Sequence, residues 1–335
     1  VNVVNNQSTA TYANGVVRGG AVDIDASNRS ASITKAGATI EGEGDSVGVG
    51  AGVAVDVGVN ETLAVIAADA DIAGSSSVAV DADSSFTADL KSEAGQQGES
   101  SGGSVGVTGT VAVGVYSNST RARIAAASNS LVSASEVHVG ASHTNNIGIE
   151  TGADAAGDKA AIGASIAIAV SNADTEALIS RDVTADSADI VASSSTSNST
   201  LARASASGAA AEEEAASGGT APAEEESSVN KDVETWQTFA TDKDDSGSTA
   251  STDTEDPDAS SSEGQVSVAA AVAVTVTDVD TVAKVDDGIT ITAVNNVAVM
   301  SSANTDAQAA ADGSAANGGV GVGVGVAINV ANNNN

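Results

Sequence analysis

The chain of 335 residues contains no cysteine, only two prolines and only five aromatic residues. The absence of cysteine excludes disulfide bridges and cysteine metal sites. A compact globule of this size usually fills its centre with bulky side chains, because these bury the most area per residue. The apolar residues here are mainly Val, Ala and Ile. We therefore expect a thin core, as between two closely apposed sheets or inside a narrow coil.

Basic residues are also scarce, because 12 Lys and Arg face 45 Asp and Glu and the formal net charge is −33. Nucleic acids and anionic membrane surfaces are bound through Lys and Arg, so we expect neither a nucleic-acid partner nor membrane insertion. The acidic balance favours solubility and the recruitment of cations. The sequence shows no signal peptide and no apolar run of transmembrane-helix length, and it starts with Val. We expect the chain to be a window onto a longer protein.

An internal repeat of about 55 residues accounts for most of the chain. Its most regular part is a strand-like stretch in which an apolar residue alternates with a small one, seen at 47–57, 105–115, 160–170, 266–276 and 320–330. The starts of these stretches are separated by 58, 55, 106 and 54 positions. The predicted units are 1–46 (partial), 47–104, 105–159, 160–265, 266–319 and 320–335 (the start of a sixth unit).

The rest of each unit repeats as well. A Thr-x-Ala-x-apolar segment follows the first stretch, as in Thr62–Ile66 and Thr120–Ile124, and a second alternating strand comes later. This register predicts that Val3 lies opposite Val57. We expect the Asn residues between the two segments, such as Asn60 and Asn118, to form a bend, since Asn tolerates left-handed backbone angles and stacks in ladders.

Nearly every regular segment alternates with period two, which predicts an all-β chain. A unit this poor in apolar bulk cannot fold alone but can be stable when stacked on its neighbours. We predict a repetitive parallel β-solenoid in which the Val face points inward. The Gly and Ala face would then allow a second sheet or a neighbouring filament to approach closely. Whether a unit makes one wide turn or two coils of about 27 residues is left open.

An acidic insertion interrupts the fourth unit at 208–264. It holds sixteen acidic residues, two lysines and both prolines. This composition is typical of a mobile or loosely folded excursion, or of a small knob packed around Trp236.

No catalytic or cofactor-binding residue is predicted, and we expect the chain not to be an enzyme, because no nucleophile–His arrangement or phosphate-binding loop occurs. His138 and His143 share a strand, but they lack a third metal ligand and are expected to face solvent. The Asp pairs could bind Ca²⁺ through oxygen ligands, although no calcium-loop motif surrounds them; they are Asp69/Asp71, Asp81/Asp83 and Asp244/Asp245. The residues that would bind a metal ion are unknown, and no cofactor is predicted apart from Ca²⁺.

The arrangement GxVGVGVAxNVxxNxTxAxI followed by IxAxxVxVxA resembles the repeats of giant secreted bacterial adhesins, both leukotoxin-type filamentous adhesins and, more distantly, filamentous-haemagglutinin-like proteins. The resemblance covers the whole chain except the insertion. It implies an exported fibre at the cell surface or released from it, and it transfers no binding residue.

The sequence therefore predicts a structural segment of a long extracellular bacterial filament or stalk that serves adhesion, cell–cell contact or matrix formation. Its partners would be further copies of itself, joined end to end or side by side, and a host or neighbouring-cell surface. Two alternatives stay open: an outer-membrane β-barrel, whose strands would have a similar length, and a calcium-stabilised binding module.

Overall fold

The computed structural model of the chain is all-β and contains no helix among the residues it describes, which are 1–40, 47–96, 104–127, 132–208, 266–316 and 319–335. The alternation of Val, Ile and Thr with small residues suits extended strands, and strands fill almost all of these ranges. The strands are β1 (Asn2–Arg18), β2 (Ala21–Ile40), β3 (Val47–Gln96), β4 (Val105–Ile124), β5 (Val132–Gly157), β6 (Ala160–Ile179), β7 (Val183–Ala185), β8 (Ser187–Gly208), β9 (Val266–Val285), β10 (Ile291–Ala293), β11 (Val297–Ala316) and β12 (Val320–Asn334).

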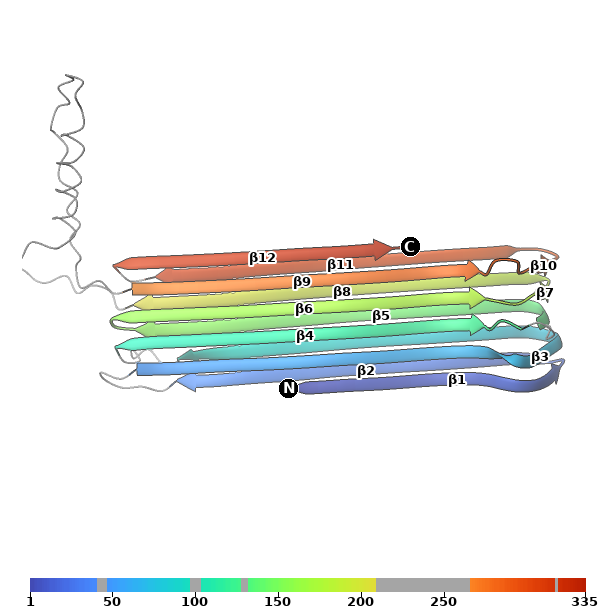
Figure 1. Cartoon of the computed structure of the whole chain (residues 1–335), viewed down its shortest axis with the longest axis horizontal. Helices are drawn as coiled ribbons and strands as arrows, with labels where there is room; N and C mark the ends of the chain where they lie inside the picture. The colour runs from blue at the N-terminus through green and yellow to red at the C-terminus, as the bar shows by residue number, and fades with distance from the viewer. Residues whose placement is uncertain (41–46, 97–103, 128–131, 209–265, 317–318) are drawn as a thin grey trace, which may run out of the picture.

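All strand pairings are parallel and join the strands into one twelve-stranded sheet. Figure 1 shows the long strands lying side by side, with the N-terminal strands at one edge and the C-terminal strands at the other. The order β3-β4-β6-β9-β12 runs along one part of this sheet. Strands β2, β5, β8 and β11 follow the same progression on the other part.

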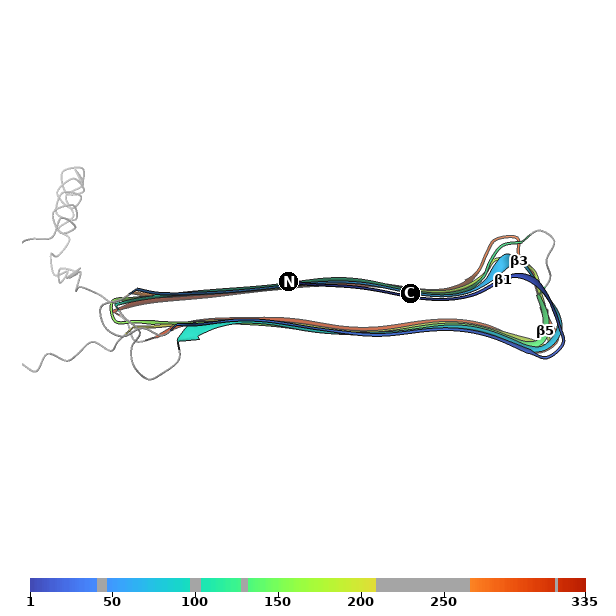
Figure 2. The same cartoon turned by 90° about the horizontal axis from the view of Figure 1, so that it is seen from below.

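The sheet curls back on itself into two long layers (Figure 2). We call the first layer β1, β4, β6, β9, β12 and residues 47–66 of β3, and the second layer β2, β5, β8, β11 and residues 77–96 of β3. Strand β3 belongs to both layers, because its 50 residues continue around the end where the layers join. The chain thus runs out along the first layer and returns along the second.

The pairing register shows how far the chain travels before it returns to a neighbouring position. Val47 pairs with Val105, and Val105 pairs with Ala160, which are steps of 58 and 55 residues. The predicted pairing of Val3 with Val57 is confirmed. A path of one wide turn fits these steps, whereas two coils of about half that length would give offsets near 27, which the register does not show.

At the end where the layers join, a short third row of strands separates them. β7 pairs with β10 and with the start of β5 at Val132. The wider space there is filled by branched aliphatic side chains, and this cluster includes Ile66, Ile72, Val80, Ile124, Val139, Ile179 and Ile190, all with 0 % exposure. A second buried cluster between the two layers contains Phe86, Leu90, Tyr116, Ile147 and Ile149 together with many Ala residues.

The expectation that the valines of the first layer point inward is wrong. Val49 and Val53 are 70 % and 60 % exposed, whereas Ala54 and Ala112 between such valines are fully buried. The reason is that larger side chains of the second layer, such as Phe86 and Ile149, fill the space between the layers. A Cβ atom on Gly58 would lie 3.0 Å from Phe86, and one on Gly114 would lie 2.7 Å from Ile149. Small residues of the first layer therefore face inward, and its valines lie outside.

The predicted bend at the Asn positions is also absent. Asn118 lies inside β4, which runs without interruption from Val105 to Ile124. Asn60 occupies the same position in β3, and its Nδ2 donates a hydrogen bond of 2.7 Å to Oδ1 of Asn118. The expected ladder of Asn side chains thus exists, but it is buried in the middle of straight strands. The predicted insertion at 208–264 lies outside the described residues except for Gly208, which ends β8.

Candidate functional site

The outer face of the first layer is aliphatic over about half of its length. We define the aliphatic face as the outward-pointing residues of 47–59, 105–115, 160–170, 266–276 and 320–330. All of them are Val, Ile, Ala or Gly, and none carries a charge. Soluble monomers rarely expose continuous apolar patches of more than about 300–600 Å². The aliphatic face is therefore a candidate interaction surface.

Charged residues border the aliphatic face along the same strands. Arg121 of β4 forms a salt bridge with Asp174 of β6, and Lys284 of β9 lies 3.1 Å from Glu176. These pairs connect neighbouring strands and lie beyond the Asn positions. They give the first layer a polar half next to its aliphatic half.

The outer face of the second layer is polar and acidic. Asp25 pairs with Asp81 in register, and Asp83 lies two residues further along the same strand. Burial raises the pKa of Asp83, and the neighbouring carboxylates of Asp81 and Asp25 raise it further. His138 is placed 3.2 Å from the Asp81 carboxylate, and this hydrogen bond raises the pKa of the imidazole. The raised pKa favours the protonated imidazole beside this cluster of carboxylates.

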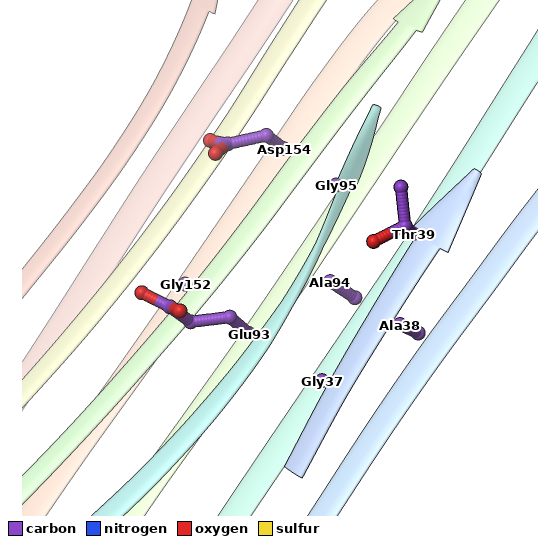
Figure 3. Close-up of a pocket in the computed structure, with 8 residues that line it drawn as sticks. All are labelled: Gly37, Ala38, Thr39, Glu93, Ala94, Gly95, Gly152 and Asp154. Carbon is purple, nitrogen blue, oxygen red and sulfur yellow. The ribbon is translucent and has the colours of Figure 1, made fainter. Parts of the chain in front are cut away.

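A shallow hollow lies at the end of the second layer away from the layer junction (Figure 3). It has a volume of about 340 Å³ and is lined by Gly37, Ala38, Thr39, Glu93, Ala94, Gly95, Gly152 and Asp154. Its two carboxylates are already engaged, because Glu93 pairs with Lys91 at 2.7 Å and Asp154 accepts a 2.6 Å hydrogen bond from the Ser205 hydroxyl. The hollow is an acidic depression without a converging set of ligand groups.

Polar side chains also fill the middle of the interior. The Asp56 carboxylate accepts hydrogen bonds from the Ser32 hydroxyl at 2.6 Å and from the Tyr116 hydroxyl at 3.1 Å. Burial and the nearby Asp56 charge raise the pKa of Tyr116, so its phenol stays protonated. Tyr116 is 1 % exposed and Asp56 is 0 % exposed. These groups connect the two layers and are not accessible to a ligand.

A buried cation closes the wide end of the interior. The guanidinium of Arg181 donates hydrogen bonds to the backbone carbonyls of Ala125 and Ala70 at 2.7 Å each, and to those of Ile66 and Ala67. The side chain is 1 % exposed, and burial lowers its pKa. Arg181 thus connects three successive turns of the chain through hydrogen bonds to four backbone carbonyls.

The structure separates the two histidines that the sequence placed on one strand. His138 points outward, whereas His143 is 1 % exposed and lies 3.4 Å from the Thr120 hydroxyl. Burial lowers the pKa of His143 to about 4. The expectation that both histidines face solvent is wrong for His143, because an odd spacing along a strand places side chains on opposite faces.

Of the predicted Asp pairs, Asp81/Asp83 lies on the polar face, Asp69/Asp71 lies in β3 near the layer junction, and Asp244/Asp245 falls outside the described residues. Within the described ranges, no group of three or more His, Asp or Glu residues could hold a metal ion. The Asp pairs are therefore not assembled into a calcium site by the described strands.

Sequence reasoning missed Arg181 and Asp56. The repeat does not predict a buried cation at Arg181, because the corresponding positions in the neighbouring turns hold Ala68 and Ala126. Asp56 does carry a signal, since it stands at a small-residue position of an alternating stretch and two positions from the place that Tyr116 takes in the next unit. A single carboxylate among glycines indicates a partner on the inner side.

Comparisons with known proteins identify no relative: no family model, no curated protein and no solved structure matches the chain. A search of the described residues for a helix long and apolar enough to cross a membrane finds none.

Proposed function

We propose that the chain is a structural segment of a long extracellular filament or stalk, built as a β-solenoid with one turn of about 55 residues per unit. The observation that carries this proposal is the register. Val53, Val111, Ile166, Val272 and Val326 follow one another in a single column across the sheet. When like residues pair in the same register from turn to turn, further turns of the same kind can be added to the stack.

The edges of the stack support continuation. In the described residues, β1 pairs only with β3, and β12 pairs only with β9. Each outer strand therefore offers one side of its backbone to a further turn of the same fold. An unpaired parallel edge is a template for another strand.

Contacts between turns support a stiff body. The Asn60–Asn118 hydrogen bond runs along the stack, and Thr62, Thr120, Thr175 and Thr281 form a fully buried column. Arg181 adds hydrogen bonds to backbone of two other turns. The Thr column repeats in four successive turns, and contacts that repeat in this way hold successive turns at one spacing along the stack.

The proposed location is the outside of a bacterial cell, and the proposed roles are adhesion, cell–cell contact or matrix formation. The resemblance to secreted adhesin repeats supports this location, and a net charge of −33 with no cysteine fits an exported, soluble fibre. The polar face of the second layer would keep neighbouring filaments apart on that side.

The architecture can be tested by adding a turn. A chain in which residues 105–159 are duplicated in tandem should fold and should lengthen by about 4.8 Å, the spacing of one strand. Small-angle scattering and circular dichroism measure both properties. A duplicated chain that unfolds, or whose extra residues remain unstructured, contradicts the solenoid.

The location can be tested separately. Antibodies raised against the chain should label intact cells of the organism that encodes it. Labelling that requires lysis of the cells would contradict an extracellular filament.

A further inference from the structure

We propose that the aliphatic face is a lateral interface, and that its occupant is the aliphatic face of a second copy of this chain. This inference rests on the proposed filament and names the partner of one of its sides. The body would then be a pair of solenoids, joined through their first layers, with the two polar second layers outside.

The area of the aliphatic face matches what a stable pair needs. Fifteen Val and Ile side chains of the aliphatic face are at least 36 % exposed, among them Val49, Val53, Ile162 and Ile166. Burying the half-exposed side chain of a Val hides on the order of 50 Å², so these residues alone would hide on the order of 800 Å² per copy. A standard protein–protein interface buries about 800 Å² per partner.

The distribution of charge selects this side for association. The second layer carries the Asp25–Asp81–Asp83 cluster on its outside, so two chains would repel each other there. The aliphatic face carries no charged side chain. An anionic lipid surface would repel the chain, whose net charge is −33.

The periodicity of the face points to a copy of the same chain as the occupant. Its side chains form rows at the strand spacing of about 4.8 Å and repeat along each strand about every 6.8 Å. Two such lattices mesh over the whole contact, because sheets pack face to face with aligned strands at about 10 Å. A partner of another architecture would match this lattice over a few side chains only.

The small positions of the face provide the holes for this packing. Ala51 and Gly109 stand among the valines, and Ala164 and Ala270 occupy the corresponding places in the next turns. A column of small residues between columns of Val leaves a groove along the stack, into which the Val column of a second copy fits.

Sedimentation equilibrium of the full chain tests the pairing. Wild type should have a mass of two or more chains of 32.1 kDa. The double variant V53K/I166K places two lysines in one column of the face, two turns apart. It should be monomeric, with a dissociation constant raised at least about 30-fold.

A matched control keeps the change of charge and the spacing but moves them to the polar face. Thr87 and Ser197 are exposed, lie in one column of the second layer and are also two turns apart. The variant T87K/S197K should associate like wild type. Circular dichroism should show folded protein for both variants, and V53T/I166T replaces the lysine variant if that one unfolds.

A wild-type chain that stays monomeric overturns the proposal, and so does a face variant that associates like wild type. Binding of the monomer to phosphatidylcholine vesicles, lost in V53K/I166K, would assign the face to lipid and also overturn it. A monomer that begins to pair once residues 212–262 are deleted would do the same, because the face would then have an occupant within the chain. Single, unpaired fibres would refute the pairing alone, whereas compact particles that cannot be lengthened by duplicating 105–159 would refute the filament.

Discussion

Gly163 in the first layer lies so close to Ser205 in the second layer that a Cβ atom on Gly163 would be 2.5 Å from the Ser205 carbonyl oxygen. The two residues are in β6 and β8, and their contact is between backbone and backbone. It sets the distance between the layers at this end of the body. This distance decides which residues can be inside.

The first prediction compares two glycines of the first layer. G163A should lower the free energy of unfolding by about 1–3 kcal/mol, because the added methyl group forces the layers apart. Gly109 points outward with open space around it. G109A should be neutral or stabilising by up to about 1 kcal/mol, since alanine has fewer conformations in the unfolded chain. Urea unfolding measures both; equal effects would show that the layers do not touch at Gly163.

The second prediction concerns the orientation of valines. Val139 is fully buried in the cluster at the layer junction, whereas Val53 is 60 % exposed on the aliphatic face. V139D should lower the free energy of unfolding by about 4 kcal/mol or more, because it buries an unpaired carboxylate. V53D should change the free energy of unfolding of the unpaired chain by no more than about 1 kcal/mol. If V53D were the more damaging substitution, the valines of the first layer would be inside after all.

The third prediction concerns the buried guanidinium of Arg181. R181M removes the buried guanidinium and its hydrogen bonds to the carbonyls of Ala70 and Ala125. We expect a loss of about 3 kcal/mol or more in thermal or urea unfolding. Arg203, which is exposed and pairs with Glu150 at 3.2 Å, serves as the control. R203M should cost about 1 kcal/mol or less.

The fourth prediction concerns pH. The pKa of His143 is about 4 in the folded chain and about 6.5 when the chain is unfolded. Between these values the unfolded chain holds more protons, so stability falls as the pH is lowered from 6.5 towards 4. The loss from His143 should reach about 2–3 kcal/mol at pH 4.5.

The acidic residues also titrate in this range, so the effect of His143 must be read as a difference. Ser84 and Ser194 occupy its position in the neighbouring turns, which makes H143S a fitting variant. Its free energy of unfolding should decline less than that of wild type between pH 7 and pH 4.5. The two declines would be equal if His143 were exposed to solvent.

Much of the architecture could be predicted from the sequence. The orientation of the strands could not, because the apolar residues switch from odd to even positions within one unit. Like residues pair with like, so the repeat gives the register, including Val3 with Val57. Within one unit, however, the apolar residues change parity: Val105 to Val115 are odd-numbered, and Ile124 is even-numbered. The Asn residues between the two sets predict a bend, but a straight strand that does not bury both sets is the other solution.

The structure keeps the strand straight and buries only the second set. Ile124 is fully buried at the wide junction, whereas Val115 is 41 % exposed. Packing at the narrow end depends on the backbone contact of Gly163 with Ser205, which connects residues 42 positions apart and leaves no trace in a pattern of alternation. The role of Arg181 could not be predicted for a similar reason. Its partners are backbone carbonyls, which every residue has, so no residue type in the sequence indicates them.

The most direct test of the account measures one distance along the stack. Ala31, Thr87, Asn146, Ser197 and Asp306 follow one another in a column on the outside of the second layer. The chain has no cysteine of its own, so spin labels can be attached to A31C and D306C, and electron paramagnetic resonance reports their separation. Four strand spacings predict about 19 Å between the two Cα atoms, with a narrow distribution. A broad distribution, or a separation of several times that length, would contradict stacked turns.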